Sequence, residues 1–344
     1  MQIFFKFIIN FNKTYFMKKI NFLIFLLPLI LFSNLAKSNY NDSLIHYNKA
    51  LYLYNHDKYN EAIREFTNSI EFENQFNYKS YYYRGRAYLE LNNYEKSILD
   101  FTNSIKFTSS DNGYESNFKM YSFIYRGLAN ESLENFDAAI NDYSDALKLE
   151  PYVYQALKYR AEVYFKVLNY KSALEDLNKA IEHYTFPNTQ TDLYCLRGLI
   201  YEEYGWSNNE DIELYLLSLK DFNKSIELNK KNVEAYFGRG KVKVRLKDYR
   251  GGILEFNKVI LMSPGFTGAF YMRGLSKLYL KRYNDAISDF NITLKKRPNY
   301  ILAYYFRGKS KQGLKNISGA CLDWSKAGEL GLKMAYDEIN KFCK

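Results

Sequence analysis

The chain has 344 residues, of which 47% are hydrophobic and 25% are charged, and it holds 63 aromatic residues but only 5 Pro. This composition excludes a largely disordered or collagen-like chain, because such chains carry an excess of Pro, Gly or net charge. The formal charge is +10, but residues 1–38 contribute five Lys and no acid. We interpret the remaining excess of five cations as too small and too dispersed for a nucleic-acid partner, which needs a concentrated basic face.

The first predicted element is an export signal. From Met17, two lysines precede an apolar run from Phe22 to Phe32, and small residues follow at Ala36 and Ser38. This is the three-part plan of a secretory signal peptide. We therefore predict a signal peptide over residues 1–38, with Met17 as an alternative start, and an exported protein that is periplasmic or secreted. The alternative is that the run stays in the membrane as an anchor, although a spanning helix needs about 18 or more apolar residues.

Downstream of this segment, one short pattern recurs with an underlying period of 34 residues. A basic residue precedes a Gly or Ala, a turn rich in Asn, Asp or Lys follows, and a second stretch then carries apolar residues at helical spacing. Each copy therefore predicts a helix hairpin. We number each copy so that the Gly or Ala is position 8, which is occupied by Ala50, Gly85, Gly127, Ala161, Gly198, Gly240, Gly274 and Gly308.

Four further positions show a recurring residue type. Position 20 is always small, as close helix crossing requires, and positions 4, 17 and 24 are aromatic in 20 of 24 cases. The pattern over residues 43–331 resembles the tetratricopeptide repeat family, in an Arg-Gly variant of the exported bacterial type. The resemblance implies an all-α fold, a right-handed α-solenoid of about eight helix-turn-helix units over residues 39–331, and a C-terminal capping helix over residues 332–344.

Two copies are eight residues longer than the others. The first insertion, near residues 108–119, is rich in turn formers and predicts a polar loop. The second, near residues 204–211, contains Trp206, which lies either on a protruding contact loop or in an extended helix pair that packs it against its own unit.

An ion pair is predicted in each hairpin. Position 7 is basic and position 23 is acidic in every copy. In the units without an internal insertion, the two positions are sixteen residues apart. Since the turn falls midway, the two side chains should lie level on facing helices. The alternative is a stripe of Arg that binds an acidic ligand, but such a stripe does not require an acid at a fixed position. The acids are Glu65, Asp100, Asp142, Asp176, Asp221, Glu255, Asp289 and Asp323.

The cysteines predict one disulfide. Cys321 and Cys343 flank Gly331 at similar distances, so that an antiparallel helix pair can bring their sulfurs together in an exported protein. The alternative is two buried free thiols, and Cys195 has no evident partner. No Cys or His cluster indicates a metal site, and no phosphate loop or nucleophile motif appears, so we expect no metal, no cofactor and no enzymatic activity.

The resemblance also implies that first helices line a concave groove through positions 2, 5, 9, 12 and 13. Aromatic and cationic side chains at these positions suit an extended or helical peptide segment, although some of the aromatics would instead cover neighbouring helices. A chaperone-tail adaptor is not indicated, because Glu162 follows Lys158 where that clamp needs Asn. The candidate groove residues are Tyr82, Arg86, Ile124, Leu128, Phe237, Lys241, Val244, Tyr271, Leu275, Tyr305 and Lys309.

The expected function is a non-catalytic protein-protein interaction scaffold that binds a peptide or protein segment in this groove. One alternative is a membrane-anchored accessory subunit of an envelope complex, in which residues 17–38 are retained. A less favoured one is an envelope glycan-acting enzyme that uses the segment near Trp206. The expected partner is a protein or peptide rather than a nucleic acid or a metal, and a membrane contact is expected only if the signal is uncleaved.

Overall fold

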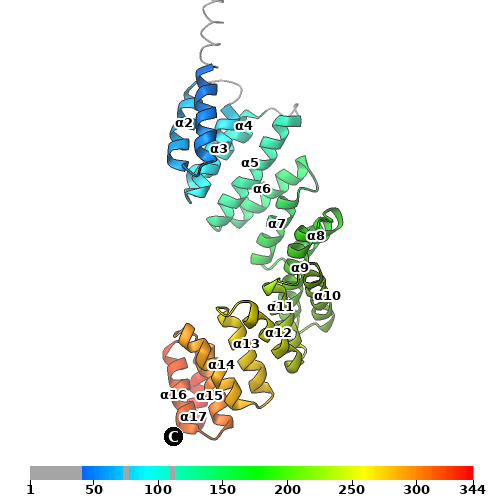
Figure 1. The fold of residues 1–344 in the computed structure, drawn as a ribbon, viewed down its shortest axis with the longest axis vertical. Coiled ribbons are helices and arrows are strands. Elements are labelled where there is room, and N and C mark those ends of the chain that lie inside the picture. The colour runs from blue at the N-terminus through cyan, green and yellow to red at the C-terminus, as the bar shows by residue number, and fades with distance from the viewer. Residues whose placement is uncertain (1–40, 73–76, 109–112, 344) are drawn as a thin grey trace, which may run out of the picture. The chain divides into compact units, whose positions relative to one another are not determined.

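The computed structural model describes residues 41–72, 77–108 and 113–343, and these residues form helices joined by short turns (Figure 1). The predicted signal peptide over residues 1–38 lies outside the described residues. Within the described ranges, no helix is both long enough and apolar enough to cross a membrane. No strand occurs in these ranges, which confirms the all-α class.

The chain divides into two compact units, Met1–Val163 and Tyr164–Lys344. In the first unit, a helix over residues 41–54 is followed by α2 (Tyr59–Glu71), α3 (Asn77–Glu90), α4 (Tyr94–Phe107), α5 (Gly113–Ser132), α6 (Phe136–Leu149) and most of α7 (Tyr154–Lys166). The second unit contains α8 (Tyr170–His183), α9 (Pro187–Ser207), α10 (Ile212–Leu228), α11 (Val233–Arg245), α12 (Tyr249–Met262), α13 (Thr267–Tyr279), α14 (Tyr283–Lys296), α15 (Ile301–Gly313), α16 (Ile317–Glu329) and α17 (Lys333–Phe342).

These helices pair in chain order into eight hairpins. Hairpin 1 joins the helix over residues 41–54 to α2, hairpin 2 joins α3 to α4, and the order continues to hairpin 8, which joins α15 to α16. We number α7 and α8 as hairpin 4 from their order in the chain alone, because the division between the two units falls within α7. We call the two members of each hairpin its first helix and its second helix.

The turn inside most hairpins has one repeated geometry. A residue with positive φ ends the first helix, and the following residues begin the second helix, where Asn93, Asp248 and Asn316 accept hydrogen bonds from the amides of its first turn. This sharp reversal places the two helices of a hairpin against each other. The positive-φ residues in these turns are Asp57, Asn92, Glu134, Leu168, Lys247, Lys281 and Lys315.

The core of each hairpin is built by positions 8, 20 and 24. The aromatic rings at position 24 are fully buried in seven hairpins, and the small residues at position 20 let the helices approach. A Cβ atom added to Gly127 would lie 2.6 Å from the ring of Tyr143, and one added to Gly240 would lie 2.6 Å from Phe256. The glycines of the Arg-Gly dipeptides are therefore packing residues.

Both insertions lengthen helices. Residues from Gly113 onward are helical, so that the loop expected near residues 108–119 is shorter than predicted, and Phe118 packs edge-on against Tyr78 and Tyr82. Near residues 204–211, α9 continues to Ser207 and α10 begins at Ile212. Trp206 therefore lies on a helix, where the guanidinium carbon of Arg245 in the next hairpin is 3.7 Å from its ring centroid. The prediction of an extended helix pair is confirmed, but Trp206 packs against the next hairpin and not against its own.

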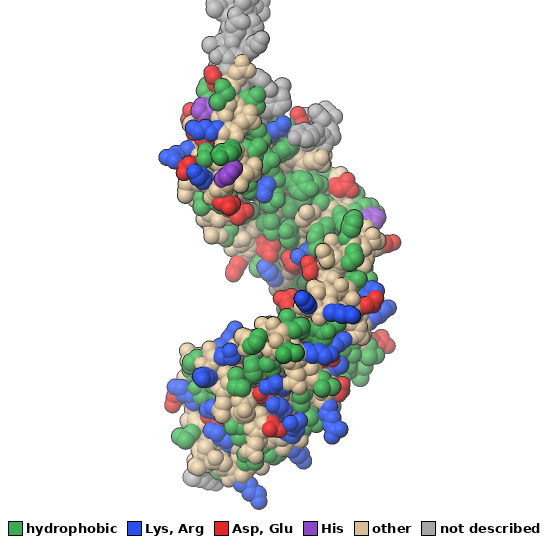
Figure 2. All heavy atoms as spheres, in the orientation of Figure 1, with side chains coloured by type: hydrophobic (Ala, Val, Ile, Leu, Met, Phe, Trp, Pro, Cys, Tyr) green, Lys and Arg blue, Asp and Glu red, His purple; other side chains and the backbone are tan. Residues whose placement is uncertain are grey.

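The cationic excess is concentrated at one end of the chain. Residues 230–344 contain 24 Lys and Arg against 9 Asp and Glu, whereas residues 41–229 contain 19 against 29. Figure 2 shows Lys and Arg side chains outnumbering acidic ones over α11–α17. The interpretation that the excess is dispersed was therefore wrong, because a small net charge conceals two segments of opposite sign.

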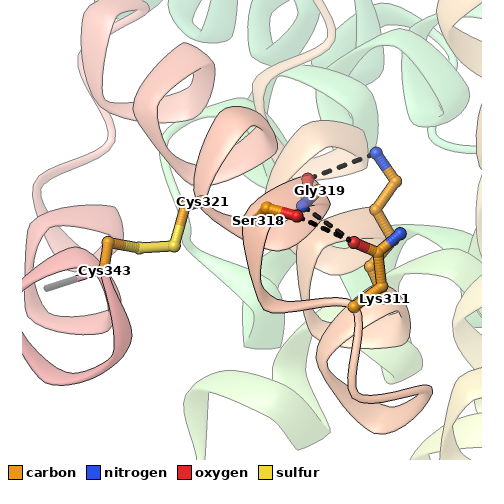
Figure 3. Close-up of a disulfide and its surroundings, with 6 residues drawn as sticks. Lys311, Ser318, Gly319, Cys321 and Cys343 are labelled. Atoms are coloured by element: carbon orange, nitrogen blue, oxygen red, sulfur yellow. Dashed lines mark hydrogen bonds between the residues drawn. A yellow bond between two sulfur atoms is a disulfide. The ribbon is translucent and has the colours of Figure 1, made fainter.

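The C-terminal end is covered by α17, which follows a turn at Gly331 with a φ of 102°. Ala335 is fully buried against Trp324, and Ile339 and Phe342 pack around the same cluster. A disulfide joins Cys321 of α16 to Cys343 (Figure 3), with their Cα atoms 5.8 Å apart. Cys195 is a buried free thiol, and burial raises its pKa to about 12.

Candidate functional site

The first helices of neighbouring hairpins lie side by side. Within the first unit α3 packs on α5, and within the second unit α9 packs on α11, α11 on α13 and α13 on α15. No comparable packing joins successive second helices in the described part of the chain. Elements on the inside of a curved stack lie closer together, so the first helices form the inner surface of each unit. We call this the first-helix surface.

The predicted ion pair is present in hairpins on both sides of the division. Arg84 binds Asp100 through two hydrogen bonds of 2.8 Å, and Arg273 binds Asp289 in the same forked arrangement. Lys49 pairs with Glu65 at 2.6 Å. The remaining confirmed pairs are Arg126–Asp142, Arg197–Asp221, Arg239–Glu255 and Arg307–Asp323. Arg160 and Asp176 lie in different units, and their pairing stays a prediction.

Each of these arginines has another partner that the sequence analysis missed. Its Nη1 atom donates a hydrogen bond of 2.6 to 3.0 Å to the side-chain oxygen at position 25 of the preceding hairpin. The signal is visible in the sequence, because an oxygen acceptor always follows two residues after the position-23 acid. These acceptors are Thr67, Thr102, Ser144, Asn178, Asn223, Asn257 and Asn291.

Position 11, whose packing is not evident from the sequence, supplies a second cation to the acid in the last three hairpins. The Nζ atom of Lys243 lies 2.7 Å from Glu255, that of Lys277 lies 2.7 Å from Asp289, and that of Lys311 lies 2.8 Å from Asp323. Although burial opposes it, the combined effect of Arg239 and Lys243 lowers the pKa of Glu255.

In hairpin 2 the acid has one cation only. Burial raises the pKa of Asp100, and Arg84 opposes this effect without cancelling it. Apart from Arg160, each position-7 arginine is thus engaged within the protein by an acid of its own hairpin and by a side-chain oxygen of the preceding one. The arginine stripe is a structural feature, and a ligand site has to be sought on the first-helix surface.

Five of the predicted groove residues are buried. Tyr82, Ile124 and Val244 are 9% exposed or less, and so are Tyr271 and Tyr305. The ring of Tyr271 packs 4.9 Å from that of Tyr300, and the hydroxyl of Tyr305 donates to Glu338 at 3.3 Å. These side chains cover neighbouring helices, which is the alternative considered from the sequence.

The other candidate positions are half-buried. Phe237 packs against Phe266 with ring centroids 4.7 Å apart, and Leu128 and Leu275 keep part of their surface exposed. Two of the three cations have acids of their own: Lys241 donates to Glu202 at 2.6 Å, and Lys309 donates to Glu338 of α17. The positive charges of Lys241 and Lys309 are therefore neutralised by acids of the protein itself.

Arg86 differs from these cations. Its guanidinium carbon lies 5.2 Å from the ring centroid of Tyr54, 5.0 Å from that of Tyr125 and 5.8 Å from that of Tyr82. The three rings come from the first helices of hairpins 1, 2 and 3. Among the described residues, no carboxylate lies within ion-pair distance of Arg86. Tyrosine faces can hold a cation in place without neutralising it.

The tyrosines around Arg86 remain neutral donors. Burial raises the pKa of Tyr54 to about 12, with Arg86 acting in the opposite direction. Burial likewise raises the pKa of Tyr82. At neutral pH the cluster of Tyr54, Tyr82, Tyr125 and Arg86 therefore presents one full positive charge beside phenol hydroxyl groups. We call this cluster the tyrosine cage.

The second unit has a charged cluster that the candidate groove residues did not include. Glu202 is fully buried, with Lys241 at 2.6 Å and the Nε atom of Arg245 at 3.5 Å. Burial raises the pKa of Glu202, and Lys241 opposes this effect. Glu202 and Arg245 occupy positions 12 and 13, which are among the five repeat positions expected to line the groove. The sequence analysis could therefore have included both.

The geometry defines a class of protein: an α-helical repeat protein in which similar hairpins are stacked within each unit and joined by a repeated arginine contact. The model of the tetratricopeptide repeat family matches residues 32–112 and 126–187. Over these two ranges the chain is similar to the tetratricopeptide repeat family. No protein with a curated description matches it in sequence.

Solved structures show the same fold. A tetratricopeptide repeat protein from Parabacteroides merdae is 18% identical with a TM-score of 0.59, and the match covers 78% of this chain and 99% of that one. The C-terminal part of a repeat protein from Cytophaga hutchinsonii is also 18% identical, with a TM-score of 0.52 and coverage of 85% and 99%. The Cut9–Hcn1 complex of the APC/C gives 15% identity and a TM-score of 0.59; the match covers 86% of this chain and 55% of that one.

Proposed function

We propose that the protein is a non-catalytic scaffold that binds a segment of a partner protein along its first-helix surface, with Arg86 as the anchor for a carboxylate of that segment. Repeat folds of this kind present a surface on which function depends on individual side chains. The observation that carries the proposal is the tyrosine cage, in which the half-buried guanidinium of Arg86 forms no ion pair with any of the residues that the structure describes.

The physical reason is that the cage holds Arg86 ready for a ligand. Its side chain is already ordered between rings from three hairpins, so binding loses little side-chain entropy. A carboxylate can then accept two parallel hydrogen bonds from the guanidinium, and such bonds are stronger than those between neutral groups. The tyrosine rings supply the apolar and hydroxyl surface that peptide segments use as anchors.

A peptide-library selection tests this proposal. The purified protein is panned against random peptides, and the affinity of the selected peptides is then measured by calorimetry for the wild type and for Arg86→Gln. We expect the selected peptides to share an Asp, a Glu or a free C-terminus. We expect Arg86→Gln to weaken their binding by about tenfold or more, since a hydrogen bond to a charged group contributes about 1.5–3 kcal/mol.

Lys309→Gln is the matched control, because Lys309 occupies the same repeat position as Arg86 but already pairs with Glu338. It should leave the affinity unchanged. Selected peptides without any acid, or equal affinities for the wild type and Arg86→Gln, would refute the role of the cage.

A further inference from the structure

The turns inside the hairpins form one edge of each unit, which we call the turn edge. It consists of the positive-φ residue of each turn and the first residues of the second helix. In hairpins 6, 7 and 8 the positive-φ residues are Lys247, Lys281 and Lys315, with φ of 63°, 58° and 62°. A side chain in this conformation costs energy that Gly avoids. Three successive hairpins thus carry a lysine at the same turn position.

The basic row of the turn edge is exposed and not neutralised. Lys247, Arg250, Lys281 and Lys315 are all exposed, and within the described ranges none of them forms an ion pair. Arg282 also lies in this row, but it pairs with Asp285 at 2.7 Å. The spacing of 34 residues between successive lysines means that the charges repeat once per hairpin.

In the first three hairpins, acids outnumber cations on the same edge, where Lys58 and Lys96 are also exposed. Asp57 and Glu134 occupy the positive-φ position of hairpins 1 and 3, with φ of 58° and 60°. Glu61, Glu95 and Asp137 lie in the first turns of α2, α4 and α6. All five side chains are exposed, and in the described structure none of them forms an ion pair.

The two rows therefore carry opposite charges at equivalent repeat positions. The positive-φ position holds Lys in hairpins 6, 7 and 8, and it holds Asp, Asn and Glu in hairpins 1, 2 and 3. The surrounding segments have the same signs, with an excess of acids over residues 41–229 and of cations over residues 230–344. A surface made of such regularly spaced charges favours a partner with the opposite charges in the same spacing.

We propose that the turn edge of hairpins 6–8 docks on the turn edge of hairpins 1–3 of a second copy of this chain. A nucleic acid or an anionic lipid surface would use the basic row only, and the acidic row would be repelled by it. A second copy uses both rows in one kind of contact. Because each copy has both rows, the contact can close into a dimer or continue head to tail.

Sedimentation velocity of the purified chain tests this inference. At about 25 mM NaCl we expect a mass above that of the monomer, and at about 500 mM NaCl the monomer, since salt screens contacts between exposed charges. The basic-row variant is Lys247→Glu with Lys281→Glu and Lys315→Glu. The acid-row variant is Asp57→Lys with Glu95→Lys and Glu134→Lys. Both should be monomeric alone at low salt, and a mixture of the two should associate.

These substitutions are matched to the turns. Glu134 shows that this conformation accepts Glu, and Lys247 shows that it accepts Lys, so that both variants should keep the unfolding midpoint of the wild type. The control is Lys295→Glu with Lys296→Glu, which removes two exposed cations from the other end of α14 and should leave self-association intact. A wild type that is monomeric at low salt, or variants that associate like the wild type, would overturn the inference. Binding of duplex DNA or phosphatidylglycerol vesicles by a monomeric wild type would assign the basic row to that polyanion instead.

Discussion

At the scale of single residues, the arginine at position 7 combines three contacts. Arg273 forks onto Asp289 of its own hairpin, donates to Asn257 of the preceding hairpin and lies over the ring of Phe270. One side chain thus joins the two helices of a hairpin and also joins successive hairpins. Arg suits this position better than Lys because its planar group has several donors in fixed directions.

The first prediction compares two members of this series. Arg84→Ala leaves Asp100 buried without any cation and should cost about 3–5 kcal/mol of stability. Arg273→Ala should cost less, about 1–3 kcal/mol, because Lys277 remains 2.7 Å from Asp289. Urea unfolding of both variants measures the difference. Equal losses would mean that the lysine at position 11 does not compensate the acid.

The second prediction concerns pH. The folded pKa of Glu255 is lowered, so its ionised form stabilises the protein above its unfolded pKa of about 4.3, and this contribution is lost as the pH falls through the folded value. The destabilisation by Glu255→Gln should therefore shrink as the pH falls from 7 to about 3.5.

Asp100→Asn is the opposite control for this measurement. Burial raises the folded pKa of Asp100, so the folded state binds the proton more tightly than the unfolded state, and the loss of stability caused by Asp100→Asn should grow as the pH falls. Unfolding midpoints at both pH values give the two trends. Trends of the same sign would contradict the assignment.

At the scale of elements, α17 depends on the rest of the array. It is short, and it covers Trp324 with Ala335 and Phe342. A terminal helix of a solenoid has neighbours on one side only. We therefore expect α17 to detach from the array more easily than the other helices. The disulfide between Cys321 and Cys343 limits this detachment, because it keeps α17 tied to α16 when its packing opens.

Reduction of this disulfide is the third prediction. It closes a loop with a sequence separation of 22 residues, so it should stabilise the docked α17 by about 3 kcal/mol. Amide hydrogen exchange of α17 should therefore accelerate by about a hundredfold in reductant, whereas exchange in α11 should not change. Cys343→Ser should exchange at the fast rate under both conditions. Three free thiols in unreduced, denatured protein, instead of Cys195 alone, would contradict the bond.

At the scale of the whole molecule, the hairpins differ mainly in the charge of their exposed residues. The hairpins share one core, one turn geometry and one arginine contact, but their exposed edges differ in sign between the two ends of the chain. Exposed charges contribute little to stability, so they vary without affecting the fold. The surface is therefore where the units acquire different partners.

Export is the fourth prediction, and it belongs to this scale. If residues 1–38 are a signal peptide, mass spectrometry of the protein from its native cells should give a chain that begins at Asn39. A protein that retains residues 17–38 and fractionates with membranes would instead support the anchored accessory subunit. A fusion of residues 17–44 to a reporter gives an independent readout of export.

The sequence by itself determined the repeat, the helix pairing and the ion pair within each hairpin. These follow from short-range rules: apolar residues at helical spacing, small residues at position 20, and two charges at equal distances from one turn. The pair Arg84–Asp100 was predictable for this reason, since both residues belong to one hairpin whose geometry the turn sets.

Only the tertiary structure decided what happens between hairpins. The hydrogen bond from Arg84 to Thr67, the burial of Tyr82 and Tyr305, and the absence of an acid near Arg86 all depend on how one hairpin is rotated against the next. That rotation results from many side chains packing at once, and no single spacing in the sequence encodes it. The sequence could therefore name the surface, but only the structure separated Lys241 and Lys309, which pair with acids, from Arg86, which forms no ion pair with any described residue.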